Sequence, residues 1–147
     1  MTFEQLLSGV WDAAKEIDPT AKLCFAQAPP RLENLLGVFV CDDETVIKSY
    51  IQVGGYVRAE VTDQYQGHVE LETLLESTDS GITFAEAETL MSNAGHPDSW
   101  NYIHLAQKTN RMVNPYFMFI YEALPRKTAT VDKENSVVTE LLLNQPE

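Results

Sequence analysis

The chain has 147 residues, of which 44% are hydrophobic, and this is enough to bury the core of one compact domain. Ten basic residues against 22 acidic ones give a formal net charge of -12. Such a charge repels phosphate backbones and anionic lipid headgroups, so we expect neither nucleic acid nor a membrane surface as a partner. The same charge favours encounter with a partner that has a basic surface.

The first predicted element is a helix over residues 3–17. Apolar residues recur at spacings of three and four, Thr2 and Gln5 fit a capping box, and Asp18-Pro19 ends the pattern. The segment has no basic start and is interrupted by acidic residues, unlike a signal peptide. No window approaches the apolar length that a membrane-spanning helix needs. We therefore expect a soluble cytoplasmic protein, with a removed leader left open.

Three extended runs follow, at residues 22–28, 35–41 and 46–53, and the last leads through two glycines to "YVRAEV". If the first two runs pair as a hairpin, Cys24 and Cys41 lie close to opposite each other. Two cysteines are too few for a disulfide scaffold. We expect two small buried hydrophobic residues, and a cross-strand disulfide only in an oxidising compartment.

The second half repeats this order. "ITFAEAETLMSNAG" predicts a helix capped by Thr83 with Glu86 three residues later, and Gly95 and Pro97 end it. Extended runs are predicted at 102–107, 116–123, 128–131 and 137–143.

A shift of the chain by 81 positions overlays the two halves, with Thr2-Phe3 on Thr83-Phe84. The predicted fold is α+β, with two tandem helix-then-antiparallel-meander (αβββ-like) units whose helices lie on one face of the sheet. The units span 1–61 and 82–147 in one compact domain, and they share one continuous sheet or form two. Within the connecting segment 62–81, "HVELETLLE" is either an extra strand or a short helix.

The second half resembles the PepSY pattern, in which a capped helix beginning Ser/Thr-x-x-Glu-Ala precedes a strand with alternating aromatics and a "VDxxTGxV" hairpin. The matching residues are Thr83, Glu86, Ala87, Tyr116, Tyr121, Val131, Asp132 and Val137. Asn135-Ser136 stands where the family usually has Thr-Gly. We interpret "VDKENSVV" as a structural hairpin in which Asp132 and Asn135 supply turn chemistry.

The tandem arrangement is similar to the architecture of the β-lactamase inhibitor protein, whose concave sheet face grips its target enzyme. The two resemblances imply a binding or inhibitory module without a cofactor.

Residues able to support catalysis or metal binding are sparse. His68, His96 and His104 lack the spacing of a metal site, and the acidic turn at 42–44 is typical of a solvated hairpin. No Gly-x-Ser-x-Gly elbow or phosphate-binding glycine loop occurs. We expect no catalytic residue, metal or cofactor, although the 22 acids leave a carboxylate-pair mechanism open.

Aromatic residues concentrate between positions 100 and 121. Strand alternation puts Tyr116, Met118 and Ile120 on one face and Phe117, Phe119 and Tyr121 on the other. One face must cover the helix, and the other is either buried against the first unit or exposed to a partner. The predicted partner-binding residues are Tyr50, Tyr56, Trp100, Tyr102, Tyr116, Phe119, Tyr121 and Arg111.

The sequence favours a non-enzymatic protein-binding module, an inhibitor or immunity-type partner that uses an aromatic sheet face with acidic surroundings. A small acidic secretion-type chaperone is one alternative. A small-ligand-binding domain or enzyme with a cleft between the two units is another.

Overall fold

The structure of the chain is a computed structural model that describes residues 2–52, 54–62, 74–77, 81–106, 114–122 and 126–142. The elements are α1 (Phe3–Ile17), β1 (Lys22–Ala28), the 3-10 turn η1 (Leu32–Asn34), β2 (Leu36–Val40), β3 (Val46–Ile51), β4 (Val57–Thr62), α2 (Phe84–Asn93), β5 (Tyr102–Ala106), β6 (Tyr116–Tyr121), β7 (Lys127–Asp132) and β8 (Val138–Leu142). None of the helices within these ranges is long and apolar enough to cross a membrane.

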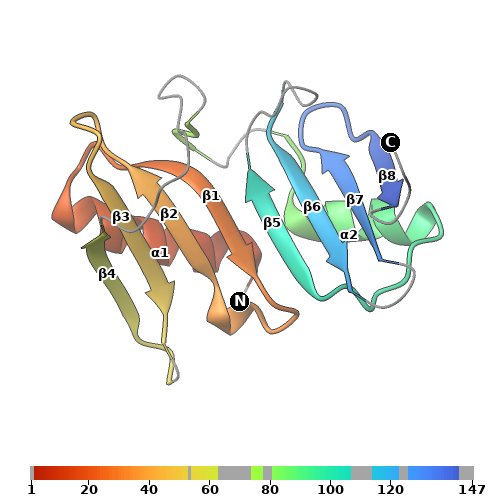
Figure 1. The fold of residues 1–147 in the computed structure, drawn as a ribbon, viewed down its shortest axis with the longest axis horizontal. Helices are drawn as coiled ribbons and strands as arrows, with labels where there is room; N and C mark the ends of the chain where they lie inside the picture. Colours follow the sequence, from red (N-terminus) through yellow and green to blue (C-terminus); the bar gives the residue numbers. More distant parts are fainter. Residues whose placement is uncertain are drawn as a thin grey trace.

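The predicted α+β class is confirmed. All strands named above join one antiparallel sheet in the order β4-β3-β2-β1-β5-β6-β7-β8. Figure 1 shows α1 and α2 on the same side of this sheet, behind the strands in that view. Because both helices cover the same face of the sheet, alternate side chains of the strands enter the core on that face. The remaining side chains lie on the opposite face.

Both helices begin with the predicted capping boxes. In α1 the hydroxyl oxygen of Thr2 accepts from the Gln5 amide at 3.1 Å, and the Gln5 side chain accepts from the Thr2 amide at 3.0 Å. Thr83 and Glu86 make the same reciprocal pair at the start of α2. Each box satisfies amides that a helix start leaves without partners, so it fixes where the helix begins.

The two halves of the sheet meet at β1 and β5. Four residue pairs join these strands, from Phe25 opposite Ala106 to Ala28 opposite Ile103. Nearer its start, β1 is bridged instead by Leu75, which pairs with Leu23. Leu75 lies in the connecting segment, whose predicted "HVELETLLE" element falls mostly outside the described residues.

On the helix side of the sheet, aromatic side chains make the core continuous across the β1–β5 junction, called the seam below. The ring of Phe3 in α1 lies 5.2 Å from that of Phe84 in α2 and 5.9 Å from that of Phe117 in β6. A Glu4 carboxylate oxygen accepts from the Phe84 amide at 3.0 Å. Phe3, Phe84 and Phe117 belong to one continuous core cluster.

The expected opposition of Cys24 and Cys41 is wrong. The β1–β2 register shifts between Leu23 and Phe25, so Cys24 falls at a bulge, and Cys41 lies just beyond the last paired residue of β2. The pairs at the start of β1, Lys22 with Val40 and Leu23 with Phe39, leave Cys41 beyond the end of the pairing, so the register set by the β1–β2 connection, and not the bulge, separates the two cysteines. Both cysteines are thiols, with Cys41 buried and Cys24 half-buried.

The hairpin between β7 and β8 follows the predicted turn chemistry. Asp132 Oδ1 accepts from the amides of Glu134 at 2.8 Å and Asn135 at 3.0 Å, and Asn135 Oδ1 accepts from the Val137 amide at 3.0 Å. Ser136 adopts a positive φ of 64°, a conformation that favours glycine. The role of Asp132 here is to hold the turn.

Among the glycines that the structure describes, Gly81 is the one whose replacement the fold tolerates least. It has a φ of 77°, and a Cβ atom there would collide with the main-chain carbonyl oxygen of Lys133. We expect Gly81→Ala to lower the free energy of unfolding by about 2–4 kcal/mol in urea denaturation. Gly95 is the matched control, because its φ of 87° is similar but a Cβ there meets nothing within 4 Å. Gly95→Ala should cost about 1 kcal/mol, and equal losses in the two variants would contradict this explanation.

Candidate functional site

The candidate site is the sheet face opposite the helices, called the open face below. Residues paired across antiparallel strands project on the same side, so the register defines rows of neighbouring side chains. One row runs from β4 to β8 through Arg58, Tyr50, Leu36, Gln27, His104, Met118, Thr130 and Thr139. The adjacent row runs from β4 to β7 through Glu60, Lys48, Val38, Phe25, Ala106, Tyr116 and Asp132.

The middle of this face is apolar. Six residues, called the apolar centre below, come from β1, β2 and β6: Phe25, Leu36, Val38, Tyr116, Met118 and Ile120. Val38 and Tyr116 are buried among their neighbours, and the other four are half-buried. No described helix lies on this side of the sheet (Figure 1).

Polar and charged residues flank the apolar centre. At the β4 edge, the carboxylate of Glu60 lies 3.3 Å from the Lys48 ammonium and 3.5 Å from the Arg58 guanidinium, and Lys48 also stacks over the Tyr50 ring. At the other end, Asp132 is engaged in its turn. An apolar middle with a polar margin is the usual composition of a protein contact surface.

The titratable groups in the middle of the face are neutral near pH 7. Burial lowers the pKa of His104, which favours the uncharged imidazole, and burial raises the pKa of Tyr116, which favours the neutral phenol. The middle of the face therefore presents little charge to a partner.

Four of the predicted partner-binding residues lie on the open face. Tyr102 is 42% exposed, Tyr50 is half-buried and Tyr116 is buried. Tyr56 is 74% exposed in the β3–β4 turn, where its backbone pairs with that of Gln52.

Trp100, Phe119 and Tyr121 were expected on a contact surface, and the structure corrects this. Trp100 packs edge-on against Phe84 and Phe119 in the core, where Phe119 is fully buried. Tyr121 is 4% exposed and donates from its hydroxyl to the Pro97 carbonyl at 2.8 Å. Phe119 and Tyr121 lie on the helix side because side chains alternate along β6 and α2 covers the face that carries these two. Trp100, just before β5, is held in the core by its contacts with Phe84 and Phe119. Arg111 lies outside the described residues.

The predicted residue set omitted Phe25, Leu36, Val38, Met118 and Ile120 of the apolar centre. Alternation already puts Met118 and Ile120 on the face opposite Phe119, so the sequence held a signal for them. Phe25 and Leu36 become neighbours of these residues only through the β1–β5 pairing, which links distant parts of the chain.

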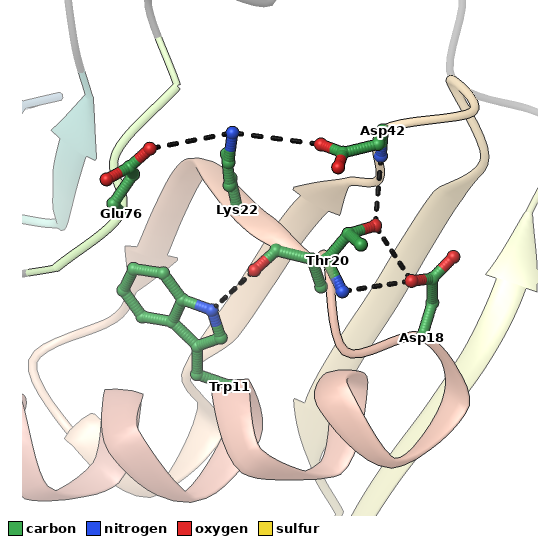
Figure 2. Close-up of polar contacts among 7 residues, drawn as sticks. Trp11, Asp18, Thr20, Lys22, Asp42 and Glu76 are labelled. Atoms are coloured by element: carbon green, nitrogen blue, oxygen red, sulfur yellow. Dashed lines mark hydrogen bonds and ion pairs between the residues drawn. The ribbon is translucent and has the colours of Figure 1, made fainter.

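An acidic corner joins the end of α1 to the β2–β3 turn (Figure 2). Asp18 accepts from both the amide and the hydroxyl of Thr20, and the Thr20 hydroxyl oxygen accepts from the Asp42 amide. The two hydrogen bonds from Thr20, first that of its amide, lower the pKa of Asp18. Lys22 spans Asp42 at 3.7 Å and Glu76 at 3.5 Å. The corner therefore ties β1 to two neighbouring segments.

The ligand atoms of Asp18, Cys41 and Asp43 lie within 4.8 Å of one another in this corner. Burial, followed by the Asp18 charge, raises the pKa of Cys41 to about 11. A thiol with this pKa stays protonated at neutral pH and is a poor nucleophile. This agrees with the expectation that Cys41 behaves as a small buried residue.

The two histidines that the structure describes do not converge. His104 is on the open face, and His96 follows α2, where its Nδ1 atom lies 3.0 Å from the Lys127 ammonium and 3.5 Å from a Glu140 carboxylate oxygen. His68 lies outside the described residues.

A hollow of about 570 Å³ lies between α1 and the segment leading into α2. Its lining includes Glu4, Asp12, Lys15, Glu76 and Thr83. This is the place in the described structure that corresponds to the cleft expected under the small-ligand alternative.

Comparison with known proteins gives a fold relationship. No protein-family model matches the chain, and no curated protein matches it either. The chain is similar to a crystal structure from Clostridium difficile 630 of a protein described as a "putative lipoprotein", with a TM-score of 0.59 and 10% sequence identity. The similarity covers 96% of each chain. At this identity it concerns the fold, which does not carry function with it, and the PepSY resemblance stays a prediction.

Ionisation of Tyr121 should lower the free energy of unfolding at alkaline pH. Burial, with the nearby carboxylates of Asp98 and Glu140, raises its pKa to about 12, whereas tyrosine in an unfolded chain has a pKa of about 10. The stabilisation is fully present below pH 10 and is lost as the pH rises through about 12. We expect the free energy of unfolding to fall by roughly 1–2 kcal/mol over this interval because of Tyr121. Urea denaturation at several pH values should give a shallower decline for Tyr121→Phe, and identical declines would refute the assignment.

Proposed function

We propose that this protein is a non-enzymatic binding module that holds a partner protein against its open face. The observation that carries the proposal is the pair of side-chain rows crossing the sheet, with an apolar centre and charged margins. An apolar sheet face without a helix over it, as here among the described residues, is a common mark of a protein contact site.

The arrangement suits a protein partner better than a small ligand. The rows extend over many strands, so the surface is broad, whereas small-molecule sites are concave and bury most of the ligand. Half-buried residues such as Leu36, Met118 and Ile120 would lose their remaining water contact on binding. Tyr102 and Tyr50 at the margin would add aromatic contacts with a polar tip.

We further propose that the chain consists of two related units, 1–61 and 82–147. Each helix is followed by four strands, and the sheet order runs outward from β1 and β5 in both directions, which supports this division. The PepSY resemblance of the second half and the similarity in architecture to the β-lactamase inhibitor protein favour an inhibitor or immunity-type role. In that role the acidic surface, with a net charge of -12, would speed encounter with a basic partner.

The test uses the tagged native chain, a variant of the open face and a control variant as baits in native lysate. Met118→Glu combined with Ile120→Lys places charges in the apolar centre and leaves the helix side of β6 unchanged. A specific partner should be recovered with the native chain and lost at least tenfold with this variant, about 1.4 kcal/mol of binding free energy or more. Phe119 is unsuited to such a test because it lies in the core.

Val61→Lys is the matched control. Val61 is an apolar residue, 59% exposed, on the helix side of the edge strand β4, so the change adds a charge away from the open face. Its bait should recover the same partner as the native chain. Recovery that is insensitive to the Met118 and Ile120 changes would refute the proposal, and capture of many unrelated unfolded proteins would favour the chaperone alternative.

A further inference from the structure

A groove of about 600 Å³ opens on the helix side of the sheet, away from the open face. It lies between α1, the connection from β1 to β2, and the end of β3. Its apolar wall consists of Leu6, Pro30, Leu32, Ile51 and Val57. This volume falls within the roughly 300–1,000 Å³ that small-molecule sites occupy.

Gly9 keeps the α1 side of the groove open. It occupies the interior of α1, where glycine is the least favourable residue except proline. A Cβ atom at this position would meet nothing within 4 Å, so neither packing nor backbone strain requires the glycine. A larger side chain on α1 at this point would project into the groove, which Gly9 lines.

Two residues of opposite charge line the groove. Arg31 and Glu33 both line it and both are exposed, on the short turn that ends in η1. Neither forms an ion pair with any other residue that the structure describes, nor do they pair with each other. An apolar cavity with an available cation and an available anion beside it is complementary to a molecule that has an apolar chain and both charges in its head.

We propose that this groove binds a single-chain zwitterionic amphiphile of the lysophospholipid class. The alkyl chain would lie against Leu6, Ile51 and Val57, in the space that Gly9 leaves. The phosphate would accept hydrogen bonds from the Arg31 guanidinium, and the quaternary ammonium would lie beside the Glu33 carboxylate. The site is on the opposite side of the sheet from the proposed partner surface, so the two proposals stand independently.

The test uses three amphiphiles with the same twelve-carbon chain and different heads, each below its micelle-forming concentration. These are dodecylphosphocholine, dodecanoate and dodecyltrimethylammonium, titrated into the whole chain by calorimetry. Dodecylphosphocholine should bind once per chain, at least tenfold tighter than either singly charged molecule. The absence of saturable binding of dodecylphosphocholine would overturn the proposal.

Two sets of variants test the location. Gly9→Leu should weaken binding of dodecylphosphocholine at least tenfold, whereas Gly9→Ala, which strengthens the helix and fills little space, should retain it. In Arg31→Gln, dodecyltrimethylammonium should bind more tightly than dodecanoate. In Glu33→Gln, dodecanoate should bind more tightly than dodecyltrimethylammonium. The proposal would be overturned if a folded Gly9→Leu bound dodecylphosphocholine as tightly as the native chain. It would also be overturned if neither charge variant altered the preference between the two singly charged molecules. Either result would show adventitious detergent association. Circular dichroism checks that each variant is folded. If Gly9→Leu does not fold, the two charge variants, which are at exposed positions, test the location of the site.

Discussion

The packing of Phe3 against Phe84 and Phe117 is the interaction on which the rest of the structure depends. It carries one core from the helix that begins the chain to the helix and strands of the second half. The Glu4 carboxylate reinforces this contact by accepting from the Phe84 amide at the start of α2. Truncation of a fully buried phenylalanine costs about 3–5 kcal/mol, which is a large part of the 5–15 kcal/mol that stabilises a typical domain.

This shared core accounts for the unequal faces of the sheet. Four residue pairs between β1 and β5 make a narrow seam, and the aromatic contacts behind it hold both helices on the same side. The opposite side then becomes continuous across the seam. His104 and Met118 of the second half lie in the same row as Gln27 and Leu36 of the first because of this arrangement. Neither half by itself would form the apolar centre.

Local sequence patterns predicted the helices, strands and turns, whereas the pairing of distant strands determines which side chains lie together on the open face. The limits of α1 follow from its capping box and the Asp18-Pro19 stop, and the β7–β8 turn follows from Asp132 and Asn135. The sequence could not indicate which face of β6 the second helix covers, so Phe119 was expected on the contact surface although it lies in the core.

The remaining misses have the same physical origin. The register that the β1–β2 connection sets, with Lys22 opposite Val40, separated the two cysteines, because a shift in register is invisible in an apolar run. The groove beside Gly9 joins residues of α1, η1 and β3, which become neighbours only after folding.

The two halves share one core cluster, and one tryptophan in each half tests whether this core unfolds cooperatively. Trp11 packs on Phe39 in the first half, and Trp100 packs on Phe84 and Phe119 in the second. The variants Trp11→Phe and Trp100→Phe each leave one fluorescent probe. In denaturant, the fluorescence transition of each variant should coincide with its own far-ultraviolet circular dichroism transition. A tryptophan transition that precedes the circular dichroism transition in either variant would show that one half unfolds independently, and would contradict the shared core.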